Sequence, residues 1–193
     1  MSSATPWMTV TPTMLAGLMR VDRRQQEDAR GFFSRLFCAD ELRAIGADAS
    51  IAQVNHSFTR RRGSVRGMHF QYPPHAETKF VSCLRGEVFD VAIDLRRGSP
   101  TFLQWHAELL SETNHRSLFI PRGFAHGFQT LRDDCELLYL HSAAYAPGAE
   151  GGLSPTDARV GIRWPLPLAE ISERDAAHPP LTDAFKGLAI ESP

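Results

Sequence analysis

The stretch KFVSCLRGEVFDVAID, residues 79–94, decides the fold class. In its second half the apolar residues Phe89, Val91 and Ile93 alternate with acidic or small ones. This period of two is expected of a half-buried strand. Arg85-Gly86 predicts a turn just before that strand, and the next turn is predicted at 97–100.

The same pattern continues on the C-terminal side of this stretch. Further runs with strand character lie between Gly, Pro, Asn or Asp residues, at 102–110, 117–120, 125–131 and 135–141. Many short strands of this kind favour a sandwich or a closed barrel. Helix signals are few: short helices are predicted at 40–45 and at 167–176, between prolines. An all-β fold with a few short helices at its ends follows.

Composition limits the classes of protein. The 193 residues suit one domain, 1–193, in which we expect residues 1–12 to be loosely ordered and 165–193 to form a helical tail. A net charge of −1 gives no general attraction for nucleic acid or for an anionic membrane. Neither a secretory signal nor an apolar run of roughly 20 residues is visible, so we expect a cytoplasmic protein.

The three cysteines, Cys38, Cys83 and Cys135, are odd in number and far apart, and none is part of a CxxC pair. This spacing argues against both a disulfide framework and a zinc site. We therefore interpret them as buried thiols.

The segment RGMHFQ, residues 66–71, with Lys79 ten residues after His69, combines a potential proton acceptor with a cation. Removal of a hydrogen next to a carbonyl needs such a base, and the carbonyl oxygen that gathers charge needs a positive partner. Alternate strand residues share a face. His126 and Tyr139 can therefore line a barrel lumen together with His69 and Lys79, and so polar a lining predicts a site for a polar ligand.

The segments RGMHFQ, PRGFAHGF (121–128), ELLY (136–139) and ERD (173–175), in this order and spacing, resemble the dTDP-4-dehydrorhamnose 3,5-epimerase family. The resemblance runs from about Arg30 to Asp175. It implies a jelly-roll barrel of the cupin type, a homodimer in which the N-terminal strands pair with a second subunit, and a nucleotide-diphosphate 4-keto-6-deoxy sugar as the ligand.

The resemblance also implies catalytic roles. His69 would be the base that removes the proton at C3, C5 or both, and Asp175 would hold its imidazole in the right tautomer. Lys79 would stabilise the enolate at the C4 oxygen. Tyr139, which is neutral at pH 7, would donate a proton from the opposite face. No metal or other cofactor is expected, because the C4 carbonyl is already an electron sink.

Substrate binding is implied for a larger set of residues. Arg30 and Arg66 suit a diphosphate, since guanidinium groups hold phosphate oxygens bidentately, and Tyr145 would stack on the nucleobase. The full set is Arg30, Gln53, Asn55, Arg66, Lys79, His126, Tyr145, Glu150 and Arg174.

Three residues depart from the family pattern: Arg35 stands where an acid is usual, Val54 where Asp is usual and Leu140 where Lys is usual. A monofunctional 3- or 5-epimerase acting on a non-thymidine nucleotide sugar is therefore an alternative.

Some features of the sequence also occur in proteins with other functions. PxGxxH at 121–126 is also a motif of metal-dependent cupins such as oxygenases, but the HxH motif of that class is replaced by His69-Phe70-Gln71. With one imidazole missing, a tight transition-metal site is not expected. A sugar-binding or regulatory module without catalysis would be favoured by loss of His69 or Tyr139, and both are present. A 3,4-ketoisomerase shares the barrel, but RGxHFQ and SERD fit epimerases better.

Overall fold

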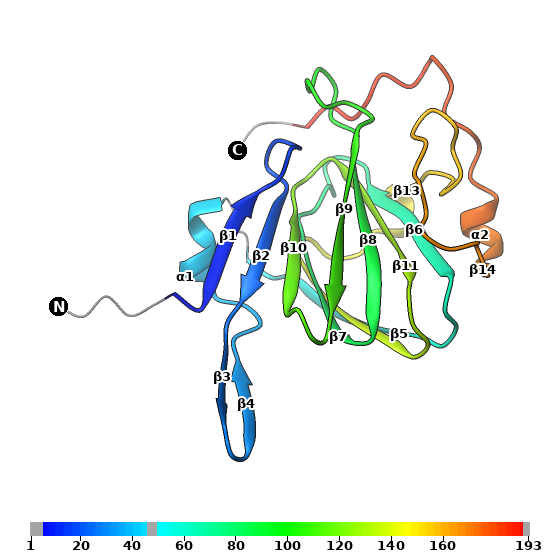
Figure 1. Cartoon of the computed structure of the whole chain (residues 1–193). Helices are drawn as coiled ribbons and strands as arrows, with labels where there is room; N and C mark the ends of the chain where they lie inside the picture. The colour runs from blue at the N-terminus through cyan, green and yellow to red at the C-terminus, as the bar shows by residue number, and fades with distance from the viewer. Residues whose placement is uncertain (1–5, 46–49, 191–193) are drawn as a thin grey trace.

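Two antiparallel sheets pack face to face in the computed structural model, which describes residues 6–45 and 50–190 (Figure 1). The first sheet has the order β1 (Met8–Pro12), β2 (Met19–Arg23), β10 (Arg116–Ile120), β7 (Lys79–Arg85), β12 (Cys135–His141) and β5 (Gln53–Thr59). The second has the order β13 (Glu150–Gly152), β6 (Ser64–Gln71), β11 (Phe124–Thr130), β8 (Glu87–Asp94) and β9 (Trp105–Ser111), and β14 (Glu170–Ile171) pairs with β6 in parallel. The expected all-β jelly roll of the cupin type is confirmed.

The remaining elements lie outside this sandwich. The hairpin of β3 (Gln25–Asp28) and β4 (Gly31–Ser34), here called the arm, projects away from both sheets (Figure 1). The helices are short: α1 (Ala39–Leu42) with the 3₁₀ turn Arg43–Ile45, the 3₁₀ turn Pro147–Ala149, and α2 (Glu173–Ala176). No helix in the described part of the chain is long and apolar enough to cross a membrane.

Most predicted elements are found, but both chain ends differ from expectation. The runs at 102–110, 117–120, 125–131 and 135–141 correspond to β9, β10, β11 and β12, and the helix at 40–45 to α1 and its 3₁₀ turn. The prediction of loosely ordered residues 1–12 is wrong for Met8–Pro12, which pair with β2 as β1; residues 1–5 lie outside the described part.

The prediction of a helical tail at 165–193 is also wrong. Within the described residues 165–190, only Glu173–Ala176 is helical, because Glu170–Ile171 pairs with β6 instead and Ser172 then caps the helix. The Ser172 hydroxyl accepts a hydrogen bond from the Asp175 backbone N–H at 3.1 Å, which is typical of a helix N-cap. Residues 191–193 lie outside the described part.

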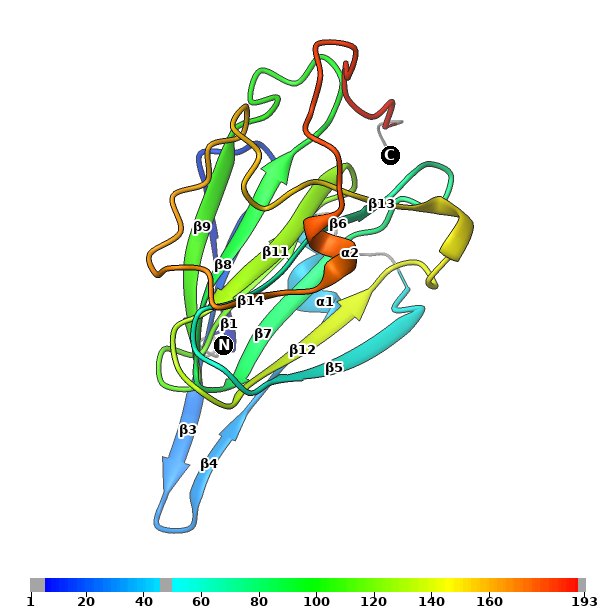
Figure 2. The same cartoon turned by 90° about the vertical axis from the view of Figure 1, so that its right-hand side faces the viewer.

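The strand at 87–94 is buried on both faces rather than half-buried. Ala92 packs in the core between the two sheets, while Val91 and Ile93 pack outward against the C-terminal segment, with Leu153 and Val160 among their neighbours. The C-terminal segment thus covers the outer face of the second sheet (Figure 2). The acidic face of the strand therefore points inward, toward the space between the sheets.

Two glycines bring β6 and β11 unusually close. A Cβ atom on Gly67 would lie 2.5 Å from the Gly127 Cα, and Gly67 has a φ of +133°, a conformation that favours glycine. The pairing of the two strands shifts register between His126 and Phe128. His69 and His126 stand directly opposite each other in these neighbouring strands.

Candidate active site

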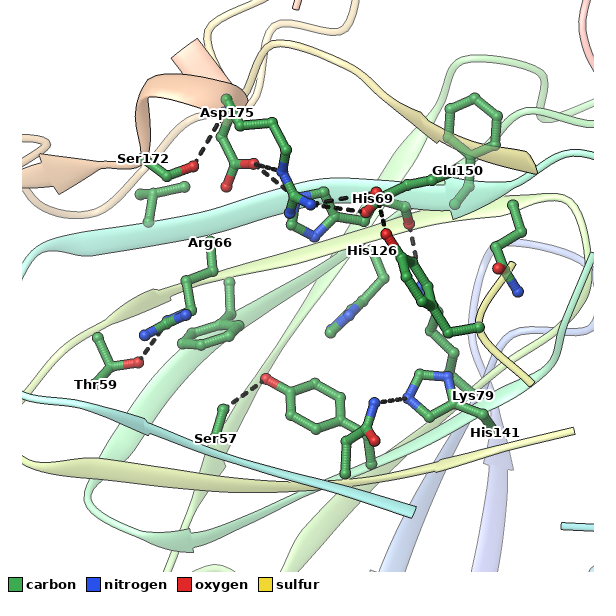
Figure 3. Close-up of a pocket in the computed structure, with 18 of the residues that line it drawn as sticks. Ser57, Thr59, Arg66, His69, Lys79, His126, His141, Glu150, Ser172 and Asp175 are labelled. Carbon is green, nitrogen blue, oxygen red and sulfur yellow. Dashed lines mark hydrogen bonds and ion pairs between the residues drawn. The ribbon is translucent and has the colours of Figure 1, made fainter. Parts of the chain in front are cut away.

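A pocket of about 1000 Å³ opens between the two sheets (Figure 3). Its lining includes ten of the residues singled out in the sequence: Asn55, Arg66, His69, Lys79, His126, Tyr139, Tyr145, Glu150, Arg174 and Asp175. Gln53 stands beside this lining and is hydrogen-bonded to Asn55 and to the Tyr145 backbone. Arg30 does not belong to it.

His69 is paired with a buried carboxylate. Its Nε2 lies 2.8 Å from Asp175 Oδ1, while the backbone N–H of Gly67 donates to Asp175 Oδ2 at 3.1 Å. Burial disfavours the charged form of Asp175, but these hydrogen bonds outweigh it and hold the pKa of the carboxyl below its usual range. Asp175 is therefore an ionised acceptor, so Nε2 carries the proton of the neutral imidazole and Nδ1 carries the lone pair.

Arg174 approaches the same nitrogen. Its Nη2 lies 3.1 Å from His69 Nε2 and its Nη1 donates to Glu150 Oε1 at 3.0 Å. A guanidinium can only donate, so Nε2 cannot donate to Asp175 and accept from Arg174 at once. We favour the Asp175 hydrogen bond because it is the shorter and its acceptor is a buried carboxylate. Arg174, whose side chain is more than half exposed, is then tied mainly to Glu150.

Lys79 lies in a buried ion pair. Its Nζ is 3.3 Å from Glu77 Oε1 and donates to the His69 carbonyl at 3.2 Å. Burial lowers the pKa of Lys79, and the charge of Glu77 opposes that effect. The other Glu77 oxygen lies 3.1 Å from His141 Nδ1.

The first sheet carries Tyr139 on β12, across the pocket from His69 on β6. The Tyr139 hydroxyl lies 3.0 Å from the Ser57 hydroxyl. Burial raises the pKa of the phenol, more than the Ser57 hydrogen bond lowers it, so the Tyr139 side chain is neutral at physiological pH. His126 stands edge-on to this ring, and its Nε2 contacts both carboxylate oxygens of Asp90, at 3.0 and 2.9 Å.

Polar groups at one end of the pocket form a connected surface. The Tyr145 hydroxyl donates to Glu150 at 2.8 Å, which raises the pKa of the exposed phenol. On the other side of the pocket, Arg66 donates to the Thr59 hydroxyl at 2.9 Å and to the Phe58 carbonyl at 3.2 Å. Arg66, Tyr145 and Arg174 are all solvent-exposed, so a ligand that enters the pocket can reach these cationic and aromatic groups.

Arg30 is the one candidate that the structure separates from the rest. It sits at the tip of the arm, where its side chain is 89% exposed and pairs with Asp28. Arg35 is likewise outside the pocket: it forms an ion pair with Glu41 and lies over the Trp7 ring. Of the three departures from the family pattern, only Val54 lines this pocket.

Several residues of the site were not assigned a role from the sequence. They are Ser57, Glu77, Asp90 and His141. Asp90 belongs to the alternating pattern of β8, and His141 follows Tyr139 by two residues, so both could have been placed on the inner face. Glu77 gave no such signal, because it lies in a loop between β6 and β7.

One group of side chains in the described ranges could approach a metal ion: His69, Asp175 and His178, whose ligand atoms lie within 4.8 Å of one another. The Arg174 guanidinium is 3.1 Å from His69 Nε2 and thus places a positive charge at this position. That charge disfavours a cation. His126, the histidine of the PxGxxH motif, is not part of the group.

Comparison with known proteins gives consistent matches. The profile of the family described as dTDP-4-dehydrorhamnose 3,5-epimerase matches residues 12–183. The dTDP-4-dehydrorhamnose 3,5-epimerase of Salmonella typhimurium is 42% identical, over 92% of this chain and 98% of its own. A dTDP-4-dehydrorhamnose 3-epimerase of Streptomyces niveus is 38% identical, over 87% and 81%. The crystal structure of the Legionella pneumophila 3,5-epimerase with dTDP-4-keto-L-rhamnose superposes with a TM-score of 0.89 at 36% identity, covering 96% of this chain and 100% of that one.

Proposed function

Because this chain belongs to the dTDP-4-dehydrorhamnose 3,5-epimerase family, and is therefore a nucleotide-sugar epimerase, we propose that it inverts C3, C5 or both of a nucleotide-diphospho-4-keto-6-deoxy sugar through an enolate. One observation carries the proposal: an imidazole–carboxylate pair and a neutral phenol face one pocket from opposite sheets, with a buried ammonium in the same pocket. Removal of a proton on one face of the sugar and its return on the other inverts a carbon.

His69 is the proposed base. With its Nε2–H donated to Asp175, the Nδ1 lone pair is available to the proton next to the C4 carbonyl. The Asp175 carboxylate then stabilises the imidazolium that forms, as in other imidazole–carboxylate pairs. The low pKa of Asp175 supports this role, because a carboxylate that stays ionised does not take the proton from the imidazolium.

Lys79 and Tyr139 are the proposed partners of the enolate. The Lys79 ammonium would lie near the C4 oxygen, where negative charge collects as the proton leaves. A fixed cation in a buried site stabilises that charge more than it would in water. Tyr139 would then return a proton from the opposite sheet, and its raised pKa keeps the phenol loaded with that proton.

The nucleotide would lie along the solvent-exposed side chains of the pocket lining. Arg66 and Arg174 are proposed to hold the diphosphate, and Tyr145 to stack on the base. Binding of a phosphate oxygen by Arg174 would also withdraw its guanidinium from His69 Nε2, which lies 3.1 Å from Arg174 Nη2. Gln53, Asn55, His126 and Glu150 are proposed to contact the sugar or the base.

We propose that the protein is a homodimer in which the arm of one chain reaches the pocket of the other. Phe32 and Phe33 of the arm are 64% and 63% exposed, and Arg30 at its tip also faces solvent. Burial of two phenylalanines favours association. Light scattering should give a mass close to twice 21.5 kDa, and Phe32→Ser with Phe33→Ser should lower it toward that of one chain. A monomeric wild-type protein would rule out this role for the arm.

Substrate identity and the number of inverted centres are tested together. The protein should be incubated in heavy water with TDP- and CDP-linked 4-keto-6-deoxyglucose, and deuterium located in the sugar by NMR. We expect incorporation at C3, C5 or both, without added metal. Deuterium at one carbon alone identifies a monofunctional epimerase. Val54→Asp restores the acid that is usual in the family, at a position in the pocket lining. It is therefore the matched variant for testing which nucleobase the pocket prefers. No incorporation with either substrate would contradict the proposed reaction.

A further inference from the structure

Lys79 is an ammonium group that the fold has almost removed from water. Its side chain is 9% exposed, and its Nζ donates to the His69 carbonyl at 3.2 Å. Burial lowers the pKa of Lys79. Fully buried lysines without a counter-charge can titrate as low as roughly 5–6. A lysine that must be charged at neutral pH therefore needs a negative partner in this pocket.

Glu77 is the carboxylate that meets this need. Its Oε1 lies 3.3 Å from Lys79 Nζ, and its side chain is only 8% exposed. Its Oε2 accepts hydrogen bonds from Gln71 Nε2 at 3.2 Å and from His141 Nδ1 at 3.1 Å. Burial opposes ionisation of Glu77, but the His141 hydrogen bond and the Lys79 charge outweigh it and hold the pKa of the carboxyl below its usual range. Glu77 is therefore a fixed negative charge.

The direction of the His141 hydrogen bond follows from a chain of contacts. The Tyr145 backbone N–H can only donate, so it fixes Gln53 Oε1 as the acceptor, 2.9 Å away. Gln53 Nε2 then donates to Asn55 Oδ1 at 3.0 Å, and Asn55 Nδ2 donates to His141 Nε2 at 3.4 Å. His141 thus carries its proton on Nδ1 and donates it to Glu77. Gln71 and His141 therefore both act as hydrogen-bond donors to the Glu77 carboxylate and hold it in place.

We propose that Glu77 is a positioning residue, which keeps Lys79 protonated and directed toward the sugar. Gln71 and His141 hold the Glu77 carboxylate in place for this role. Two other carboxylates face Lys79, Asp90 from β8 and Glu150 from β13, and both act on its charge through space. Within the described ranges, Glu77 is the carboxylate that forms an ion pair with Lys79. The consequence for catalysis rests on the proposed function, in which the Lys79 ammonium stabilises the enolate oxygen.

The composition of the chain allows a direct test. The sequence contains two lysines, Lys79 and Lys186, and Lys186 is exposed. Protein labelled with ¹³C-lysine should give two Cε signals, whose pH titration reports the two ammonium groups separately. Glu77→Gln keeps the shape of the side chain and removes its charge. We expect the Lys79 midpoint to fall by about 1–3 pH units, the usual effect of losing an opposite charge at this distance, while Lys186 is unchanged.

Two further variants complete the experiment. Glu77→Asp keeps the charge and should leave the Lys79 midpoint closer to that of the wild type than Glu77→Gln does. Glu112→Gln removes an exposed acid outside the pocket lining and should change neither signal. An unchanged Lys79 midpoint in Glu77→Gln would overturn the inference.

The pH profile of kcat/KM separates this inference from the proposed function. Loss of the Lys79 proton should set the alkaline limb, which should move to lower pH in Glu77→Gln by the same amount as the NMR midpoint. If the midpoint moves and the limb does not, the link between Glu77 and Lys79 stands, and the role of Lys79 as the partner of the enolate is wrong.

Discussion

Replacement of His69 by alanine should abolish both epimerisation and deuterium incorporation at C3 and C5. Loss of a general base typically lowers a rate by about 10²–10⁴-fold. The expected loss is at the upper end of this range or beyond, because His69 is the one imidazole of the pocket that pairs with Asp175. Nucleotide-sugar binding should stay within about tenfold, since the variant removes no proposed phosphate contact.

The measurement is wash-in of deuterium by NMR under single-turnover conditions, with binding measured by calorimetry. His106→Ala on β9, outside the pocket, is the matched control: it also deletes an imidazole that contacts a carboxylate, Glu108 at 3.2 Å. Asp175→Asn should act in the same direction as His69→Ala, but less severely, because it disturbs the tautomer without removing the imidazole. Near-normal turnover in His69→Ala would show that another group is the base.

Tyr139→Phe should separate proton removal from inversion. Phenylalanine keeps the ring, its packing against the core and its edge contact with His126, but deletes the proposed donor on the sheet opposite His69. In the proposed mechanism His69 would still remove the proton and Lys79 would still stabilise the enolate, so His69 itself would return most of the protons to the enolate. Deuterium should enter the sugar with retained configuration, while epimer formation falls by about 10²-fold or more.

Ser57→Ala is the companion variant, because it removes the hydroxyl that lies 3.0 Å from the Tyr139 hydroxyl but leaves the phenol itself in place. It should preserve most of the inversion. If Tyr139→Phe loses wash-in and epimerisation equally, Tyr139 positions the substrate or the base instead. If neither is lost, the donor is another group, and Tyr145 or a bound water should be tested next.

The sequence predicted the inner face of the barrel better than its outer cover. Strand periodicity placed His69, His126 and Tyr139 on faces that the structure does bring to one pocket, because the direction of a side chain on a strand is a local property. It could not show that the C-terminal segment covers the outer face of β8, which is a contact between residues far apart in the chain. For that reason the strand at 87–94 was expected to be half-buried.

Partners of the site residues were harder to predict than the residues themselves. His69 and Asp175 are 106 positions apart, and their pairing could be expected only through the family resemblance. Glu77 and His141 are 64 positions apart, and neither residue alone indicates a role in the site. They come into contact because β7, which begins just after Glu77, pairs with β12. Arg30 stands apart for another reason: the pocket within its reach, if the arm acts as proposed, is formed by a different chain.

The projecting arm has a genetic consequence. If it completes the pocket of the partner, each catalytic unit is encoded by two copies of the chain, one supplying the barrel and one the arm. A substitution of Arg30 then damages the arm that one chain supplies to a pocket, and a substitution of His69 damages the barrel that the other chain supplies. Two such alleles, each inactive alone, would complement one another when expressed together, because one of the two pockets in a mixed dimer receives an intact arm and an intact base.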